Sequence, residues 1–316
     1  MAGPLFAALV AAAPAAAQQV SCSGSASPLA FGDVDVLSSA PVDVTSTVTV
    51  NCTVGLLGIL SYNHVCVDIG AGSVGNTVFD RRMASGANRL SFQIYTDAAR
   101  SNVFGGPAGG SSVAVSQTNP ILLPGTRTST VTVYGRVFGG QSAAVIGDYA
   151  TNLDITLRYL RNYSAGHPGC GAGDFSSASF TGPVTATVAR NCYVSANDLL
   201  FATTGSLTGS IDAASSLSVQ CSSQTPYTLR ANAGQGLGAT VALRRMTQSS
   251  GETIDYRLYT DAGRTILWGD GTAGTSTLGG TGTGGSQTLS FFGRVPAQAT
   301  PSSGLYNDQV TVTIVY

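Results

Sequence analysis

Charge is scarce in this sequence. Asp, Glu, Lys and Arg make up 10% of its 316 residues and leave a net charge of -1. Basic residues form no cluster, which argues against nucleic acid as a partner. No apolar run reaches the length of about 18 residues that a membrane-spanning helix needs. Helical periodicity is nowhere sustained, whereas Gly, Ser, Thr and Val are abundant, so we expect an all-β protein with two cores.

Signatures of catalysis and of metal binding are also missing. The two histidines, His64 and His167, belong to no Ser/His/Asp or Cys/His signature, and we expect both at the surface or in loops. The cysteines include no C-x-x-C pair of the kind that indicates zinc. Residues 269–274 match G-x-G-x-x-G, but no helical pattern follows, as a dinucleotide site requires. We therefore expect no enzyme, no cofactor and no metal site.

The chain begins with an apolar run at residues 5–17 that ends in three alanines. Small residues at this place are typical of a signal-peptidase site, so residues 1–17 are predicted to be a signal peptide. The mature chain is then expected to start near Gln18 and to be exported through the periplasm.

Six cysteines are consistent with an oxidising compartment. Two pairs are separated by 30 and 29 positions at corresponding places in the two halves of the chain, which favours pairing within each half. The remaining two have no counterpart, so we pair them with each other. The predicted disulfides are Cys22–Cys52, Cys192–Cys221 and Cys66–Cys170.

The second half of the chain repeats the first. The sequence RRM occurs at residues 81–83 and 244–246, YTDAAR at 95–100 recurs as YTDAGR at 259–264, and YGRV at 134–137 recurs as FGRV at 292–295. In both YTDA copies we expect a surface turn in which Asp97 pairs with Arg100, and Asp261 with Arg264.

Short runs bounded by Gly, Asn, Asp and Pro predict strands within each copy. In the first copy they cover about residues 27–37, 43–52, 61–69, 76–82, 89–96, 112–117, 128–137 and 148–160. Short strands at this spacing suggest an immunoglobulin-like sandwich. We expect a first domain at residues 18–160, a linker with one strand at 161–190, and a second domain at 191–316.

The strand in the linker belongs to neither copy. In residues 180–188 the apolar side chains are Phe180, Val184, Ala186 and Val188, and threonines separate the last three. This alternation predicts a strand with one buried face. We expect it to complete the first domain as its final strand, whereas the second copy ends without such a strand.

Both copies share an ordered set of motifs. These are a Cys, an L-x-F pair (Leu29 and Phe31; Leu199 and Phe201), a second Cys, Y-T-D-A, G-R and a final G-x-Y…Y. The set resembles the spore coat protein U domain, the pilin domain of archaic, Csu-type chaperone–usher pili. The resemblance implies tandem immunoglobulin-like pilin sandwiches in which a fold lacking its last strand is completed by a partner. The implied partners are a periplasmic chaperone, an outer-membrane usher and the N-terminal donor strand of the next pilin.

Only about four residues separate the predicted mature start from Cys22, fewer than the 5–6 residues of a typical strand. We therefore expect a subunit that receives a donor strand and gives none. Such a subunit would lie at the pilus tip, like the two-domain tip adhesins of the family.

The first copy carries apolar loops where the second copy is polar or Gly/Thr-rich. They are VGLLGIL at residues 54–60, NPILLPG at 119–125 and AAVI at 143–146. Exposed apolar patches usually mark binding surfaces, and in the tip adhesins of the family apolar finger loops are thought to contact hydrophobic surfaces. The expected contact residues are Val54, Leu56, Leu57, Ile59, Leu60, Ile121, Leu122, Leu123, Val145 and Ile146. The alternative is that these residues extend strands or cover the first core.

Strand direction tests whether the loops can act together. If the strands alternate in direction, the 53–60, 118–125 and 160–172 connections share one end of the domain. The 138–147 loop then lies at the other end, beside the second domain. In that case Leu160 and Tyr163, rather than Val145 and Ile146, would provide the third contact.

We interpret the chain as a tip adhesin on the cell surface that attaches cells to abiotic or host surfaces and supports biofilm formation. One alternative is a structural coat or fibre-shaft subunit. Another is a lectin with a polar cleft, which the aliphatic character of the loops disfavours.

Overall fold

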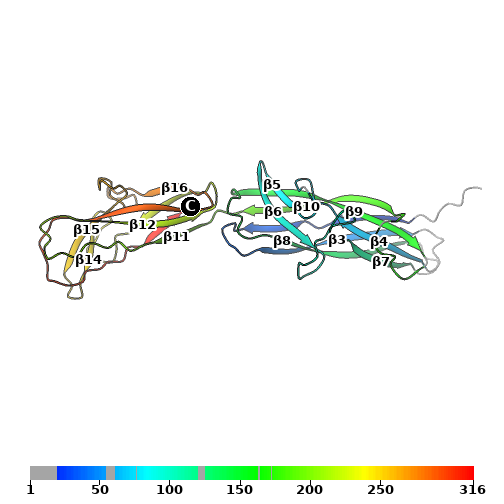
Figure 1. Ribbon diagram of the computed structural model, residues 1–316, viewed down its shortest axis with the longest axis horizontal. Coiled ribbons are helices and arrows are strands. Elements are labelled where there is room, and N and C mark those ends of the chain that lie inside the picture. Colours follow the sequence, from blue (N-terminus) through cyan, green and yellow to red (C-terminus); the bar gives the residue numbers. More distant parts are fainter. Residues whose placement is uncertain (1–19, 55–60, 76, 120–124, 163, 172) are drawn as a thin grey trace, which may run out of the picture.

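The computed structural model describes residues 20–54, 61–75, 77–119, 125–162, 164–171 and 173–316. Two elongated β-domains follow one another along the longest axis of the molecule (Figure 1). In the described part of the chain the regular elements are β-strands, in agreement with the all-β prediction. Within these same residues, no helix has the length and apolar character that crossing a membrane requires.

Ten strands are described in the first domain. They are β1 (Ser21–Ala26), β2 (Leu29–Val34), β3 (Val42–Val54), β4 (Ser61–Ile69), β5 (Arg81–Ser85), β6 (Asn88–Tyr95), β7 (Val113–Asn119), β8 (Gly125–Val137), β9 (Gly147–Asn162) and β10 (Ser176–Val188). On one face β1, β3 and β8 pair, and on the other β7, β4, β9, β10 and β2 pair in that order. The hairpin β5–β6 links the faces, because β6 pairs with β8 and β5 meets β9 at Ala84 and Ala150.

The core of the first domain follows from alternation along the long strands. β3 and β8 alternate valines with Thr and Ser, and Val48, Val50, Val131 and Val133 turn inward. β-branched residues of this kind suit a pleated, half-buried surface. They pack in one apolar cluster with the inward residues of β9. Each fully buried aliphatic side chain contributes about 1.5–3 kcal/mol, so this face carries much of the stability of the domain.

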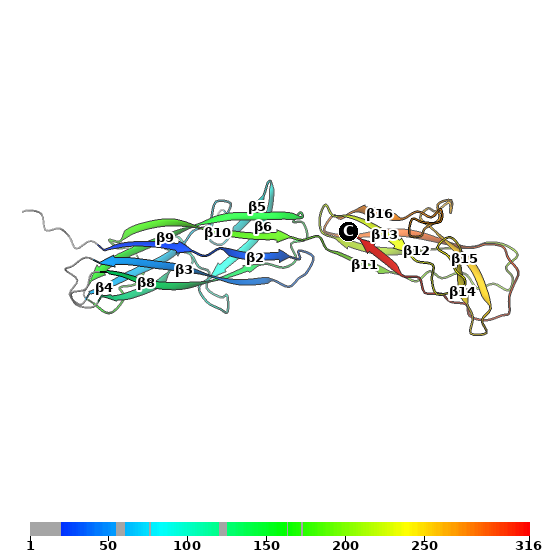
Figure 2. The ribbon, with the colours of Figure 1, turned by 180° about the vertical axis from the view of Figure 1, so that it is seen from behind.

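The strand β10 closes the first domain. It pairs antiparallel with β9 from Ser176 to Val188 and parallel with β2 on its other side (Figure 2). Val184, Ala186 and Val188 are buried, and Phe180 packs half-buried against the same core. The strand expected at residues 180–188 therefore exists, begins four residues earlier at Ser176, and lies between two strands of the first domain.

The second domain is built from eight described strands. They are β11 (Cys192–Ala196), β12 (Ile211–Cys221), β13 (Pro226–Ala231), β14 (Arg244–Thr247), β15 (Thr253–Tyr259), β16 (Leu278–Thr281), β17 (Ser286–Val295) and β18 (Val312–Val315). One sheet has the order β11-β12-β17-β15-β14 and the other the order β16-β13-β18. The core between them contains the fully buried Leu217, Val219 and Leu229 together with Trp268 and Phe291.

Three disulfides connect the cysteines in the predicted pairs. Cys22–Cys52 and Cys192–Cys221 join the first strand of each domain to the strand beside it. Cys66–Cys170 joins β4 to the connection between β9 and β10. The two pairings predicted from spacing are confirmed, and so is the pairing of the two cysteines that have no counterpart in the other half.

The repeated RRM motif supplies a buried arginine in each domain. Arg81 donates to the carbonyl oxygens of Ile69 and Phe104, both at 2.7 Å. Arg244 donates to the carbonyl oxygen of Trp268 at 3.0 Å. Burial lowers the pKa of Arg81 to about 9, because no carboxylate offsets the loss of water around its charge. These arginines therefore supply hydrogen-bond donors to backbone carbonyls in the interior of each domain.

The YTDA turns differ from the prediction. Asp97 accepts backbone N–H groups of Ser101 and Asn102, and Arg100 instead reaches Asp43 at 3.2 Å. The second copy is the same: Asp261 accepts from Thr265 and Ile266, and Arg264 lies 3.3 Å from Asp212. The expected Asp97–Arg100 and Asp261–Arg264 pairs are wrong because each aspartate caps its own turn.

One strand of the first domain was not predicted, and another lies at residues other than those expected. β1, which carries Cys22, was not expected, because its sequence SCSGSA has no apolar alternation. The strand expected at 76–82 lies at Arg81–Ser85, where a turn at Gly86 (φ 58°) leads into β6.

A short polar junction connects the domains. Asn191 and Tyr193 both donate to Oδ2 of Asp35, at 2.8 and 2.9 Å. The Ile146 N–H donates to the carbonyl oxygen of Ser223 at 3.4 Å. The 138–147 loop thus lies beside the second domain, as strand direction predicted.

Candidate functional site

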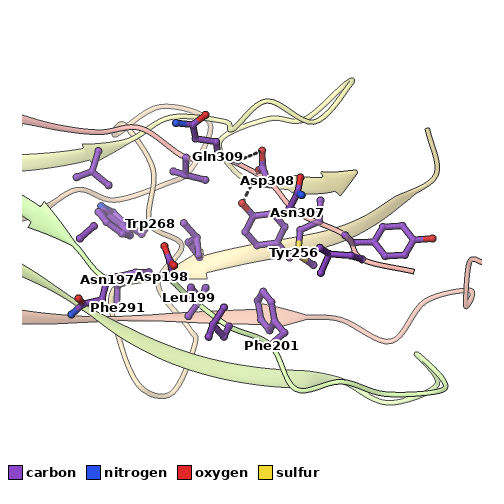
Figure 3. A pocket seen from close by; sticks show the side chains of 18 residues that line it. Asn197, Asp198, Leu199, Phe201, Tyr256, Trp268, Phe291, Asn307, Asp308 and Gln309 are labelled. Atoms are coloured by element: carbon purple, nitrogen blue, oxygen red, sulfur yellow. Dashed lines mark hydrogen bonds between the residues drawn. The ribbon is translucent and has the colours of Figure 1, made fainter. Parts of the chain in front are cut away.

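An open groove runs through the second domain. It encloses about 450 Å³ between residues 196–201 on one side and 305–312 on the other. Figure 3 shows aromatic side chains on its floor. The floor comprises Met246, Tyr256, Leu258, Trp268 and Phe291, which belong to the core of the domain.

The place that this groove occupies is filled in the first domain. There β10 lies between β9 and β2. The counterpart of β9 is the segment at 304–316 that ends in β18, and β18 pairs with β13 on one side. The counterpart of β2 is the segment with Leu199 and Phe201. In the described part of the second domain, no strand separates these two segments.

The exposed fractions of equivalent residues show how differently β9 and its counterpart in the second domain are covered. Leu153, Ile155 and Leu157 of β9 are 4%, 2% and 0% exposed. Their counterparts Val310, Val312 and Ile314 stand at the same distances before the last tyrosine of the repeat, and all three are half-buried. The sequence places apolar side chains on this face, and nothing in the described second domain covers them as β10 covers β9.

Two carboxylates, Asp198 and Asp308, line the groove, and Asp308 bonds to its floor. Asp308 accepts a hydrogen bond from the Tyr256 hydroxyl at 2.7 Å (Figure 3). It accepts another from the Gln235 N–H at 2.7 Å. Burial raises the pKa of Tyr256, and its hydrogen bond to Asp308 raises it further, so the phenol stays a donor. Asp308 therefore anchors the 304–311 segment to the floor.

The groove is suited to binding an extended strand. A strand placed between the two segments would hydrogen-bond to backbone on both sides, and its alternate side chains would cover the apolar floor.

A single cluster of potential metal ligands occurs among the described residues. It comprises Cys66, His167 and Cys170. Two of its three members are joined in a disulfide, and a thiol binds metal as the thiolate. The oxidised cluster therefore lacks the ligands that zinc requires.

His64 differs from expectation. It is 0% exposed in β4, with Nδ1 2.9 Å from the Ser116 hydroxyl and Nε2 2.9 Å from Oδ1 of Asn162. Its ring meets that of His167 edge-on, with centroids 5.0 Å apart. The prediction of a surface or loop position is wrong for His64, because polar partners allow its burial. His167 lies in the connection between β9 and β10, as expected.

Most of the expected surface-binding residues lie outside the described part of the chain. These are Leu56, Leu57, Ile59, Leu60, Ile121, Leu122 and Leu123, together with Tyr163. The strand ends that flank the two loops are described and lie together: Val54 pairs with Gly125 and Ser61 with Asn119. Leu160 lies nearby in β9, half-buried. Figure 1 shows β4 and β7 at the end of the first domain that faces away from the second.

Three expected contact residues require correction. Val54 is 3% exposed, because β3 continues through it and turns its side chain into the core. Val145 and Ile146 are half-buried at the opposite end of the domain, where they meet the backbone of Ser223 in the second domain. None of the three presents a free side chain at the distal end.

Of the residues that line the groove, the sequence motifs included Leu199 and Phe201 but not the aromatic residues of the floor. Tyr256, Trp268 and Phe291 were not singled out, because an aromatic residue in a strand looks the same whether a neighbour covers it or not. Alignment of the two repeats could have identified them. These positions align with Phe92, Phe104 and Val133, which β10 helps to enclose in the first core.

Comparisons with known proteins agree with this description. A family model described as Spore Coat Protein U domain matches residues 6–156 and 178–313. No curated protein sequence matches the chain.

Among solved structures, a chain of the CsuC–CsuE chaperone–tip adhesion subunit pre-assembly complex, from archaic chaperone–usher Csu pili of Acinetobacter baumannii, shares the fold. The TM-score is 0.54 at 18% identity, over 94% of this chain and 100% of that one. The CupB6 tip adhesin from Pseudomonas aeruginosa matches with a TM-score of 0.36 at 11% identity, over 93% of both chains. CfaE, the adhesive subunit of CFA/I fimbria of enterotoxigenic Escherichia coli, matches with a TM-score of 0.31 at 11% identity, over 91% of this chain and 92% of that one.

Proposed function

The chain belongs to the spore coat protein U domain family, and from that premise we propose that it is the tip adhesin of a chaperone–usher pilus. Its second domain accepts a β-strand from a partner, and the far end of its first domain binds surfaces. The protein acts in attachment and biofilm formation after export through the periplasm.

The observation that carries the proposal is the contrast between the two domains. The first domain is closed by β10, whereas the second leaves its core residues open along a groove of about 450 Å³. Open strand edges over an apolar floor promote aggregation unless a partner covers them. A chaperone strand would cover the groove in the periplasm, and the N-terminal donor strand of the next pilin would replace it at the usher.

The described strands that flank the two apolar loops support an adhesive role for this end. At the ends of β4 and β7, Asn63 and Asn119 are fully buried and bonded to each other, with Nδ2 of Asn119 2.9 Å from Oδ1 of Asn63. A buried amide pair fixes the register of the strands that carry the loops. The described strand ends that flank the loops therefore form a fixed base at the end of the molecule away from the groove (Figure 1).

The groove is tested by placing one charge on its wall. Val310→Asp puts a carboxylate where a bound strand would pack, whereas Thr311→Asp puts it on the exposed side of the same segment. We expect Val310→Asp to abolish co-purification with the periplasmic chaperone and display on pili, because an unpaired charge resists burial.

The Thr311→Asp variant should retain both properties. If Val310→Asp binds the chaperone and reaches the pilus tip as the wild type does, the groove is not the assembly site.

A further inference from the structure

The two domains share one architecture, but the side chains around the position of β10 differ between them. In the first domain the ring of Phe180 lies directly over Gly24 of β1. A Cβ on Gly24 would stand 2.5 Å from Cε1 and 2.6 Å from Cζ of that ring. The absence of a side chain at Gly24 is therefore what admits Phe180.

The second domain has Val194 at the corresponding position. Gly24 and Val194 each lie two residues after the first cysteine of their domain, on β1 and β11. Val194 packs against the core of the second domain, so its side chain points to the inner side of the strand. It occupies the space that an aromatic ring at the Phe180 position would need.

A second difference concerns Gly182, the next inward-facing residue of β10 after Phe180. In the first domain a Cβ on Gly182 would meet Cδ1 of Ile155 at 3.0 Å and Cβ of Ala26 at 3.1 Å. The second domain keeps an alanine, Ala196, but replaces Ile155 with Val312, which has no Cδ1 atom. A strand in the second groove therefore has room for a side chain where β10 must have glycine.

We propose that Val194 selects the strand that the second domain accepts and keeps the β10 strand of this chain out of it. The inference rests on the proposed function, strand acceptance by the groove. The partner strand has a small residue where β10 has Phe180 and a residue with a Cβ where β10 has Gly182. Its remaining inward residues are apolar, as Val184, Ala186 and Val188 are.

Keeping β10 out of the second domain prevents uncontrolled association between copies of this chain. β10 is an apolar strand that already fits a groove of the same fold. If the β10 of one molecule entered the second domain of another, the contact would repeat from molecule to molecule and build an open chain. A steric block at one residue prevents that exchange without weakening the first domain.

The test uses the full chain and synthetic peptides of residues 176–188. Trp268 is the only tryptophan of the protein and lies on the groove floor, so its fluorescence reports binding. The peptides are the wild-type sequence, Phe180→Ala, Phe180→Ala with Gly182→Ala, and Ala186→Asp as the control with a broken apolar face.

We expect the Phe180→Ala peptide to bind about tenfold more tightly than the wild-type peptide or better, as overpacking by a ring implies. The additional Gly182→Ala change should tighten binding further. In the Val194→Gly variant the preference for the Phe180→Ala peptide should disappear. In the Val194→Ala variant, which lowers the strand propensity of β11 less than glycine does, the preference should be reduced.

Equal dissociation constants for the wild-type and Phe180→Ala peptides on the unaltered chain would overturn the role of Val194 and leave strand acceptance intact. If no peptide alters Trp268 fluorescence, both strand acceptance and the inference built on it are wrong.

Discussion

Tyr149 and Tyr306 make the same hydrogen bond in the two domains but have different surroundings. Each hydroxyl donates at 2.8 Å to the carbonyl oxygen four residues earlier, of Val145 and of Ser302. Tyr149 is 1% exposed, whereas Tyr306 is half-buried. The difference arises because Ala186 of β10 pairs opposite Tyr149, and no described residue takes that position opposite Tyr306.

The closing role of β10 can be tested with one charge. Ala186 is 4% exposed, and the adjacent Thr185 turns outward. We expect Ala186→Asp to lower the free energy of unfolding of the first domain by about 3 kcal/mol or more, because it buries an unpaired carboxylate. Thr185→Asp should change it by less than about 1 kcal/mol.

Urea unfolding followed by circular dichroism measures the first domain, and Trp268 fluorescence separates the transition of the second. Equal stabilities of the two variants would mean that β10 is not part of the first core.

A second prediction concerns pH and the connection between β9 and β10. Burial, and to a lesser extent the neighbouring His64, lower the pKa of His167, while a hydrogen bond to the Val65 carbonyl opposes them. Below about pH 6.5 the unfolded chain therefore binds a proton that the folded chain resists, and stability falls as pH falls.

Substituting His167→Gln should remove part of this loss. The measurement is the free energy of unfolding of the first domain at pH 7 and pH 5 for both proteins. An identical decrease in the two would show that His167 does not contribute.

A third prediction tests adhesion through the apolar loops. Replacing both Leu57 and Leu122 with Ser should abolish binding of piliated cells to plastic, because each aliphatic side chain buried against an apolar surface contributes up to about 1.5–3 kcal/mol. Many pili per cell multiply such a contact by avidity. Binding by the unaltered protein should persist in high salt, since the interaction is not ionic.

Pili must still assemble, and the first domain must unfold as before, for the loss to report adhesion. Unfolding of the double variant would show instead that these leucines belong to the core. Normal binding would direct attention to a saccharide ligand, tested by competition.

Sequence patterns predicted the parts of this fold that repeat or alternate. Residues 180–188 were predicted as a strand because Val184, Ala186 and Val188 alternate with threonines. The nearly equal cysteine spacings, 30 and 29 positions, predicted two disulfides. β1 could not be found this way, because its order comes from pairing with β3 and from the Cys22–Cys52 bond rather than from an apolar pattern.

The candidate groove was predicted only in outline. The repeat predicted that no strand of the second copy would take the place of β10, and none of the described strands does. The lining of the groove, however, depends on which faces remain uncovered in three dimensions. For Val54 the sequence pattern predicted too much exposure. Its loop-like neighbours suggested an exposed side chain, but β3 continues through Val54 and buries it. The Asp43–Arg100 contact joins residues 57 positions apart by sequence number, beyond what a local motif can indicate.

The central claim is that the first domain has its closing strand and the second awaits one. Amide hydrogen exchange of the full chain, measured with and without the Phe180→Ala peptide of residues 176–188, tests it most directly. The account predicts slow exchange in β9 under both conditions. At residues 304–314 it predicts fast exchange of the amides that β13 and the other described residues leave unpaired, and slow exchange of these amides when the peptide binds. Protection at residues 304–314 equal to that of β9 without any added strand would contradict it.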